Sequence, residues 1–175
     1  MKKLFAIFTV LLILQVCSFA KDTLQFDFPN NGWHQVASPD GVSSKKCYVP
    51  YNQNADSYTE MLIFYERVLK SNNIAPLSIL HRQLGKDRNN YIDIIPEYIS
   101  QDLDDAMVTW CSKLKNTCAV ERAFQGKDGV IIAIYLNKAP HYSQNMFGQW
   151  SNILKNIKLY DNTASTGHGS IIELD

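Results

Sequence analysis

The cysteines are the residues of this chain best suited to chemistry, and Cys47 is the first to consider. A thiol becomes a nucleophile when nearby positive charge lowers its pKa and a base can take its proton. Lys45 and Lys46 stand directly before Cys47 and would supply that charge. The base would be a histidine brought close by the fold, and four are available: His34, His81, His141 and His168. Cys47 is therefore a candidate reactive thiol.

The same cysteine has a second interpretation. It lies in Lys46-Cys47-Tyr48-Val49, a segment typical of a strand, and free cysteine is among the most buried residue types. A small thiol packed inside a sheet is chemically inert, because it meets neither substrate nor solvent. We favour this interpretation. The two differ in one observable, since a nucleophile must be reachable from outside.

Cys111 and Cys118 form the closest cysteine pair, with Ser-Lys-Leu-Lys-Asn-Thr between them. If the flanking segments pair as a hairpin, the two side chains lie opposite each other, and an oxidising compartment would join them. Such a bridge stabilises by about 2.5 kcal/mol through the short loop that it closes. A redox-active pair normally has two residues between its cysteines, whereas this pair has six. We therefore predict a structural disulfide.

The common catalytic and metal-binding patterns are absent from the sequence. It contains no Gly-x-Ser-x-Gly segment, no glycine-rich phosphate loop ending in Lys-Ser/Thr and no His-Glu-x-x-His. Asp102, Asp104 and Asp105 offer oxygen ligands of the kind that calcium prefers. They lack the glycine and the distal glutamate of a helix–loop–helix calcium site, so we interpret them as a solvated acidic connector. We assign no catalytic residue, metal ligand or cofactor.

The first 20 residues have the pattern of a secretory signal peptide. Lys2 and Lys3 give a positive start, and residues 4–16 form an apolar run that is too short to span a bilayer. Ser18 and Ala20 are small residues at the positions that precede a cut. We predict cleavage after Ala20 and export of the mature chain, to the periplasm or out of the cell.

A competing signal lies within the same segment. Leu14-Gln15-Val16-Cys17 begins like a lipoprotein site, in which Cys17 would carry a lipid anchor. Val16 argues against it, because a small residue normally precedes the lipidated cysteine. Lipid anchoring through Cys17 is thus the alternative to release after Ala20. The short Lys-Lys start and the absence of an Asn-x-Ser/Thr sequon agree with a bacterial exported protein.

The charge of the chain argues against a nucleic-acid partner. The chain holds 17 basic and 17 acidic residues, and removing Lys2 and Lys3 with the signal leaves 15 against 17. A net charge of about −2 without a basic stripe cannot displace counterions from phosphates. We expect one globular domain over residues 21–160, long enough to bury a full apolar core, with no transmembrane segment in the mature chain.

The hydrophobic pattern predicts strands first and a long helix last. Residues 23–28 and 33–37 predict an N-terminal hairpin, residues 42–49 a strand and residues 58–69 a further strand. A short helix is expected at residues 77–84, then a strand at 91–95 and an acidic connector at 97–105. Strands at residues 106–114, 118–125 and 130–136 follow, the last two joined by a turn that ends in Asp-Gly.

The strand predicted at residues 130–136 is apolar on both faces, so each face needs a cover. One cover is a helix at residues 143–159, because Phe147, Trp150 and Leu154 lie on one apolar stripe. The other is the short helix at residues 77–84. We therefore expect an α+β fold, in which a mostly antiparallel sheet is flanked by helices as an α/β/α sandwich.

The two ends of the mature chain carry a pattern of their own. Residues 26–33 are Phe-Asp-Phe-Pro-Asn-Asn-Gly-Trp, and the apolar strand at 129–135 precedes the helix with Phe147, Trp150, Ile153 and Leu154. Together they resemble the start and the end of PsbP-like domains. The resemblance implies an antiparallel sheet between helices and a non-enzymatic accessory or binding role. It supplies no binding residue and leaves residues 38–105 unmatched.

Residues 161–175 are predicted to be a flexible tail, because most of them are small and polar. We expect the apolar end of the tail, around Ile171 and Ile172, to be unanchored. Docking on its own domain or on the sheet edge of a partner are the alternatives.

The sequence as a whole predicts an exported non-enzymatic accessory or binding protein with an unidentified protein or small-molecule partner. The alternative is a small secreted hydrolase or thiol enzyme that uses Cys47 with a histidine.

Overall fold

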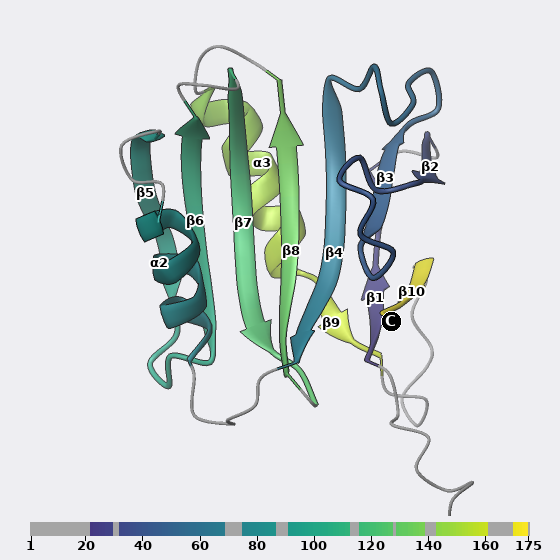
Figure 1. Cartoon of the computed structure of the whole chain (residues 1–175). Helices are drawn as coiled ribbons and strands as arrows, with labels where there is room; N and C mark the ends of the chain where they lie inside the picture. Colours follow the sequence, from purple (N-terminus) through teal and green to yellow (C-terminus); the bar gives the residue numbers. More distant parts are fainter. Residues whose placement is uncertain are drawn as a thin grey trace, which may run out of the picture.

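A seven-stranded antiparallel sheet runs through the molecule, with a helix on each face (Figure 1). The computed structural model describes residues 22–29, 32–68, 75–86, 91–112, 116–127, 129–138, 143–160 and 170–174. Across the sheet, the strands follow the order β2 (Trp33–Val36), β3 (Lys46–Pro50), β4 (Glu60–Val68), β8 (Gly129–Asn137), β7 (Thr117–Gln125), β6 (Asp105–Ser112) and β5 (Tyr91–Ile99).

Each face of this sheet has its own cover. Helix α2 (Pro76–Lys86) packs on β6 and β7, and α3 (Gln144–Lys155) lies behind the sheet in the view of Figure 1. A second, three-stranded sheet lies on the α3 side, in the order β10 (Ser170–Glu173), β1 (Thr23–Phe26) and β9 (Lys158–Leu159). The predicted α+β fold, a mostly antiparallel sheet flanked by helices, is confirmed. Neither helix of the described residues is long and apolar enough to cross a membrane.

The alternation of side chains along the central strands produces two cores. Successive residues of a strand point to opposite faces. Val120 and Ile131 therefore pack under α3, together with Phe147 of that helix. Ala119 and Ile132 pack under α2 on the other face. Both faces of the β8 strand are buried, as its apolar sequence predicted.

The first two strands do not form the predicted N-terminal hairpin. β1 pairs with β9 and β10, whereas β2 pairs with β3. The prediction was wrong because the partners of β1 come from the far end of the chain. Only partners that follow closely in sequence can be inferred from a turn signal.

β5 is longer than predicted. It continues through Pro96 to Ile99, where the sequence suggested that a strand stops and an acidic connector begins. Proline has no N–H to donate, but β5 is the edge of the sheet, where one side of the strand needs no donor. The register with β6 shifts between Pro96 and Tyr98, as it also does earlier in the strand. The connector is therefore confined to residues 100–104.

The end of the chain is anchored. β10 pairs with β1, and Ile172 and Leu174 are only 2% and 0% exposed in the core under α3. The prediction of an unanchored terminus is thus wrong for residues 170–174, because their alternating apolar side chains complete the smaller sheet. Residues 161–169 lie outside the described residues, as do the predicted signal peptide, Cys17, His141 and His168.

Candidate functional site

Cys47 lies in β3 without exposed surface, packed with Val49 and Met61. Burial raises the pKa of its thiol, and the hydroxyl of Ser38 and the charge of Lys45 offset only part of this effect. The structure confirms the buried cysteine that we favoured. An inaccessible thiol that is less acidic than usual is a poor nucleophile, so its surroundings speak against the reactive-thiol interpretation.

The described histidines do not form a catalytic pair with Cys47. His34 lies on β2, and its ring stacks on that of Tyr51 with 5.3 Å between the centroids and 13° between the planes. His81 is exposed on α2, which packs on β6 and β7 rather than on β3. The structure therefore leaves Cys47 as a core residue of the sheet.

The predicted disulfide is present. Cys111 and Cys118 are directly opposite each other on β6 and β7, and their sulfurs are bonded. Both are buried, at 5% and 1% exposure, in the core under α3. The disulfide links β6 to β7 within the core, where a redox partner cannot reach it, so its role is structural.

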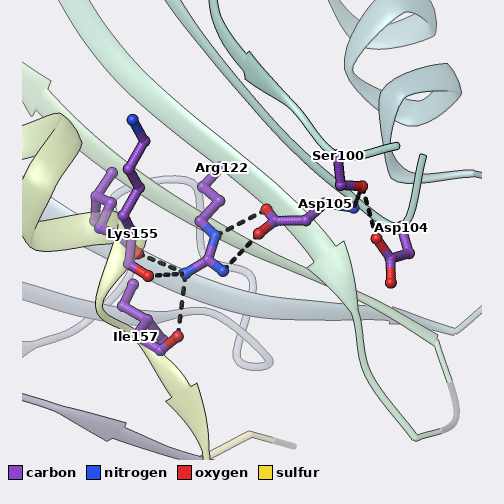
Figure 2. Close-up of polar contacts among 7 residues, drawn as sticks. Ser100, Asp104, Asp105, Arg122, Lys155 and Ile157 are labelled. Carbon is purple, nitrogen blue, oxygen red and sulfur yellow. Dashed lines mark hydrogen bonds and ion pairs between the residues drawn. The ribbon is translucent and has the colours of Figure 1, made fainter. Parts of the chain in front are cut away.

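The acidic run before β6 does not form a ligand cluster. The guanidinium of Arg122 donates to both carboxylate oxygens of Asp105, from Nε to Oδ1 at 2.9 Å and from Nη2 to Oδ2 at 2.8 Å. Asp104 accepts a hydrogen bond from the Ser100 hydroxyl at 2.6 Å (Figure 2). In the described parts of the chain, no group of three or more His, Cys, Asp or Glu side chains could hold a metal ion.

Arg122 also closes the end of helix α3. Its Nη1 donates to the carbonyl oxygens of Leu154 at 2.7 Å, Lys155 at 3.1 Å and Ile157 at 3.1 Å (Figure 2). These carbonyls lie at the negative end of the helix, where partners are otherwise missing. Each of the three guanidinium nitrogens thus has a protein acceptor, and Arg122 is only 9% exposed. This network holds the fold together and presents no charge to a ligand.

A groove lined by aromatic side chains lies between α3 and the nearby ends of β2, β3, β4 and β8. Its volume is about 440 Å³, which falls in the range of small-molecule sites. Its principal walls are Trp33, Glu60, Tyr135, Met146, Trp150 and Ile153. We call this hollow the aromatic groove.

The rings of the aromatic groove hold one another in place. Tyr135 and Trp150 stack face to face, with 3.9 Å between centroids and 12° between planes. Trp33 meets Trp150 edge to face at 5.7 Å, and its indole N–H donates to the carbonyl of Pro29 at 3.1 Å. Trp33 is half-buried, whereas Trp150 is buried. Because the rings are fixed by these contacts, the wall of the groove is formed before any ligand arrives.

A chain of hydrogen bonds runs along the same wall. The amide nitrogen of Asn137 donates to the Tyr135 hydroxyl at 3.0 Å, and this hydroxyl donates to Oε2 of Glu60 at 3.1 Å. The direction follows from the chemistry, because an amide nitrogen only donates and a carboxylate only accepts. The Met146 sulfur lies within 3.6 Å of the Tyr135 hydroxyl as a weaker acceptor. The pKa of Tyr135 is raised, mainly by burial, so the phenol keeps its proton at neutral pH.

Glu60 brings the one charge among the described residues that line the groove. Its carboxylate receives the hydrogen bond from Tyr135, and no described basic side chain forms an ion pair with it. Lys138, which directly follows β8, has its ammonium nitrogen 3.7 Å from the ring centroid of Tyr58. The groove can therefore hold an apolar body against its rings and offer a charged acceptor at one end.

A second hollow of about 330 Å³ lies on the other side of Ile153. Its walls include one aromatic ring, Phe26, and the two opposite charges of Asp27 and Lys158. It lacks the cluster of aromatic rings and has no unbalanced charge. The aromatic groove is therefore the stronger candidate for a binding site.

Sequence reasoning missed most of this site. It placed Trp33 in a strand and Trp150 in a helix stripe, but it did not single out Glu60 or Tyr135. One signal could have found Glu60, because it shares the α3-facing side of β4 with Leu62 and Phe64. A carboxylate at the end of an apolar row is unusual and predicts a specific partner. The contact with Tyr135 depends on the pairing of β4 with β8, which the sequence does not reveal.

These features define a small α+β sandwich protein with an aromatic groove between its sheet and one helix. No protein-family model matches the chain, and no curated protein matches it. Among solved structures, the chain is similar to the Ran-binding protein Mog1p of Saccharomyces cerevisiae, with a TM-score of 0.40 and 11% identity over 77% of this chain and 89% of that chain. A mutant of protein Mog1 gives a TM-score of 0.42 and 9% identity over the same shares.

Proposed function

We propose that this protein is an exported, non-enzymatic binding protein and that the aromatic groove is its binding site. The observation that carries the proposal is the composition of the groove. Trp33, Trp150 and the thioether of Met146 line a hollow of about 440 Å³, backed by the buried ring of Tyr135 and with one carboxylate at its end. Apolar walls with a few convergent polar groups are the usual composition of a small-molecule site.

Export is proposed from the first 20 residues, and the periplasm or the cell exterior is the destination. The Cys111–Cys118 bridge supports it, because disulfides persist in oxidising compartments. Membership of the PsbP-like superfamily stays a prediction from the two ends of the domain. Mass spectrometry of the chain from its native cells distinguishes a mature start after Ala20 from a lipid on Cys17.

The binding site can be tested with the indole N–H signals of the three tryptophans. Trp33 and Trp150 line the groove, whereas Trp110 contacts Glu121 on the opposite face of the sheet and serves as an internal control. We would titrate ¹⁵N-labelled protein with benzylamine, benzyl alcohol and benzoate, which share one ring and differ in charge. At least one probe is expected to shift the Trp33 and Trp150 signals in a saturable way and to leave Trp110 unchanged.

Gly32 offers a variant that blocks the groove without crowding the fold. It lines the groove, and a Cβ added there meets no atom within 4 Å. Gly32→Leu is expected to abolish probe binding. Gly85→Leu, at an equally open position on α2, is the matched control and should bind as the natural protein does. The proposal fails if no probe shifts the two signals, or if Gly32→Leu binds every probe unchanged.

A further inference from the structure

The charge balance of the aromatic groove is incomplete. Glu60 is the one charged residue among its described walls, and its carboxylate contacts the neutral phenol of Tyr135 rather than a cation. A carboxylate that is partly removed from water gains most from a positively charged donor. Among the described residues, Asp105 has such a donor and Glu60 has none. The groove therefore lacks a positive group that a ligand could bring.

The hydrogen-bond chain fixes this carboxylate in one orientation. Asn137 donates to the Tyr135 oxygen, so the single phenolic proton is left to donate to Oε2 of Glu60. This bond occupies only one of the two carboxylate oxygens. The other oxygen can accept hydrogen bonds from a ligand without any change in the protein.

The walls around the carboxylate also suit a cation. The faces of tryptophan rings attract positive charge electrostatically, and indole does so best among the aromatic side chains. Trp33 is half-buried at the groove, and the soft sulfur of Met146 lies beside the Tyr135 hydroxyl. A ligand whose ammonium group pairs with Glu60 would thus place its apolar body against the side chains that line the groove.

We infer that the aromatic groove binds the positively charged nitrogen of an amine or guanidine, carried on a small apolar body. This inference rests on the proposed function and adds the chemical class of the ligand. An anion would be repelled by the charge of Glu60, and a neutral ligand would gain the apolar contacts and a hydrogen bond but no ion pair. The two sources of such a group are a free amine and the side chain of a lysine or arginine in a polypeptide.

The three benzyl probes test the inference, because they share a ring and differ in charge. From the titrations of the Trp33 and Trp150 signals, benzylamine is expected to bind at least about tenfold more tightly than benzyl alcohol. Benzoate is expected to bind more weakly than either. The preference for benzylamine should decrease with added salt, because the pair with Glu60 is partly screened.

Two variants that each remove one carboxylate charge test whether Glu60 causes the preference for benzylamine. Glu60→Gln keeps an acceptor for Tyr135 and is expected to remove the roughly tenfold preference while binding benzyl alcohol as before. Asp27→Asn removes the same charge from the second hollow and is expected to keep the preference. If benzyl alcohol or benzoate binds the groove as tightly as benzylamine, or if Glu60→Gln keeps the preference, the inference is wrong while the proposed function stands. If no probe binds, both fail.

A second pair of probes distinguishes the two sources. Butylamine carries the side chain of lysine without a backbone, and N-acetyl-lysine N-methylamide carries it as in a polypeptide. Tighter binding of the blocked lysine supports a polypeptide partner, and tighter binding of butylamine supports a free amine. Both results agree with the inference. Binding of butanol as tight as that of butylamine overturns it.

Discussion

Asp105 and Glu60 both lie on the α3-facing side of the large sheet, but their carboxylates have different partners. Asp105 accepts hydrogen bonds from Nε and Nη2 of the Arg122 guanidinium, whose Nη1 closes the end of α3 (Figure 2). Glu60, at the other end of the same helix, receives one hydrogen bond from a neutral phenol. The charge of Asp105 is paired with a cation, whereas that of Glu60 has no cationic partner among the described residues.

The partners of the two carboxylates distinguish a structural charge from one that is available for binding. A buried charge must have a partner, because its desolvation is otherwise too costly. When the partner is internal, as for Asp105, the pair belongs to the architecture. When the fold supplies only an orienting hydrogen bond to a half-buried carboxylate, as for Glu60, the carboxylate is open to a partner from outside. Substitutions of Arg122, Tyr135 and Glu60 test this difference between the two carboxylates.

Removing the guanidinium of Arg122 should have the largest effect on stability. Arg122→Met keeps an apolar stem but leaves Asp105 and the carbonyls at the end of α3 without their donor. We expect the free energy of unfolding to fall by about 3 kcal/mol, measured by urea denaturation. Arg82→Met, on the exposed side of α2, is the control and should change it by less than about 0.5 kcal/mol. A loss below about 1 kcal/mol for Arg122→Met would contradict the structural role.

Alkaline pH tests the hydrogen-bond chain from Asn137 through Tyr135 to Glu60. Burial raises the pKa of Tyr135 above its ordinary value of 10.0, so the folded protein holds this proton more tightly than the unfolded chain. The resulting stabilisation is intact below about pH 10 and is lost as the pH rises above that value.

The natural protein should therefore lose stability faster than Tyr135→Phe above about pH 10, by at most about 1.4 kcal/mol per pH unit. Urea denaturation of both proteins at several pH values measures the difference. Burial also raises the pKa of Cys47, Tyr48 and Tyr58, but these groups are common to both proteins and cancel. Parallel losses in the two proteins would show that Tyr135 is not protected.

Neutralising Glu60 should have the smallest effect on stability. Glu60→Gln retains an acceptor for the Tyr135 hydroxyl and removes a charge that pairs with no described cation. We expect the free energy of unfolding to change by less than about 0.5 kcal/mol. The same denaturation experiment gives the value. A loss close to that of Arg122→Met would mean that Glu60 is a structural charge and not a binding one.

Local features of the fold could be predicted from the sequence. The apolar run at residues 130–136 indicated a strand covered on both faces, and it became the center of β8 with both covers in place. The spacing of Cys111 and Cys118 indicated a disulfide across a hairpin. In each case the partners lie close in sequence, or the pattern itself states what surrounds it.

The aromatic groove could not be predicted, because it depends on distant pairings. Glu60 meets Tyr135 only because β4 pairs with β8, which places Glu60 opposite Asn137. Trp33 reaches Trp150 because an edge strand and a late helix meet over the same face. Sequence periodicity reports which side of an element is apolar, but it does not report which other element that side will meet.

The three-stranded sheet constrains the order in which this protein can fold. β1 occupies its center, and its partners are β9 and β10, near the other end of the chain. Until residues 158–173 have been made, β1 has no strand to pair with and Leu24 and Phe26 lack part of their core. Closing so long a loop is entropically slow. The segment synthesised early is therefore among the last to become ordered.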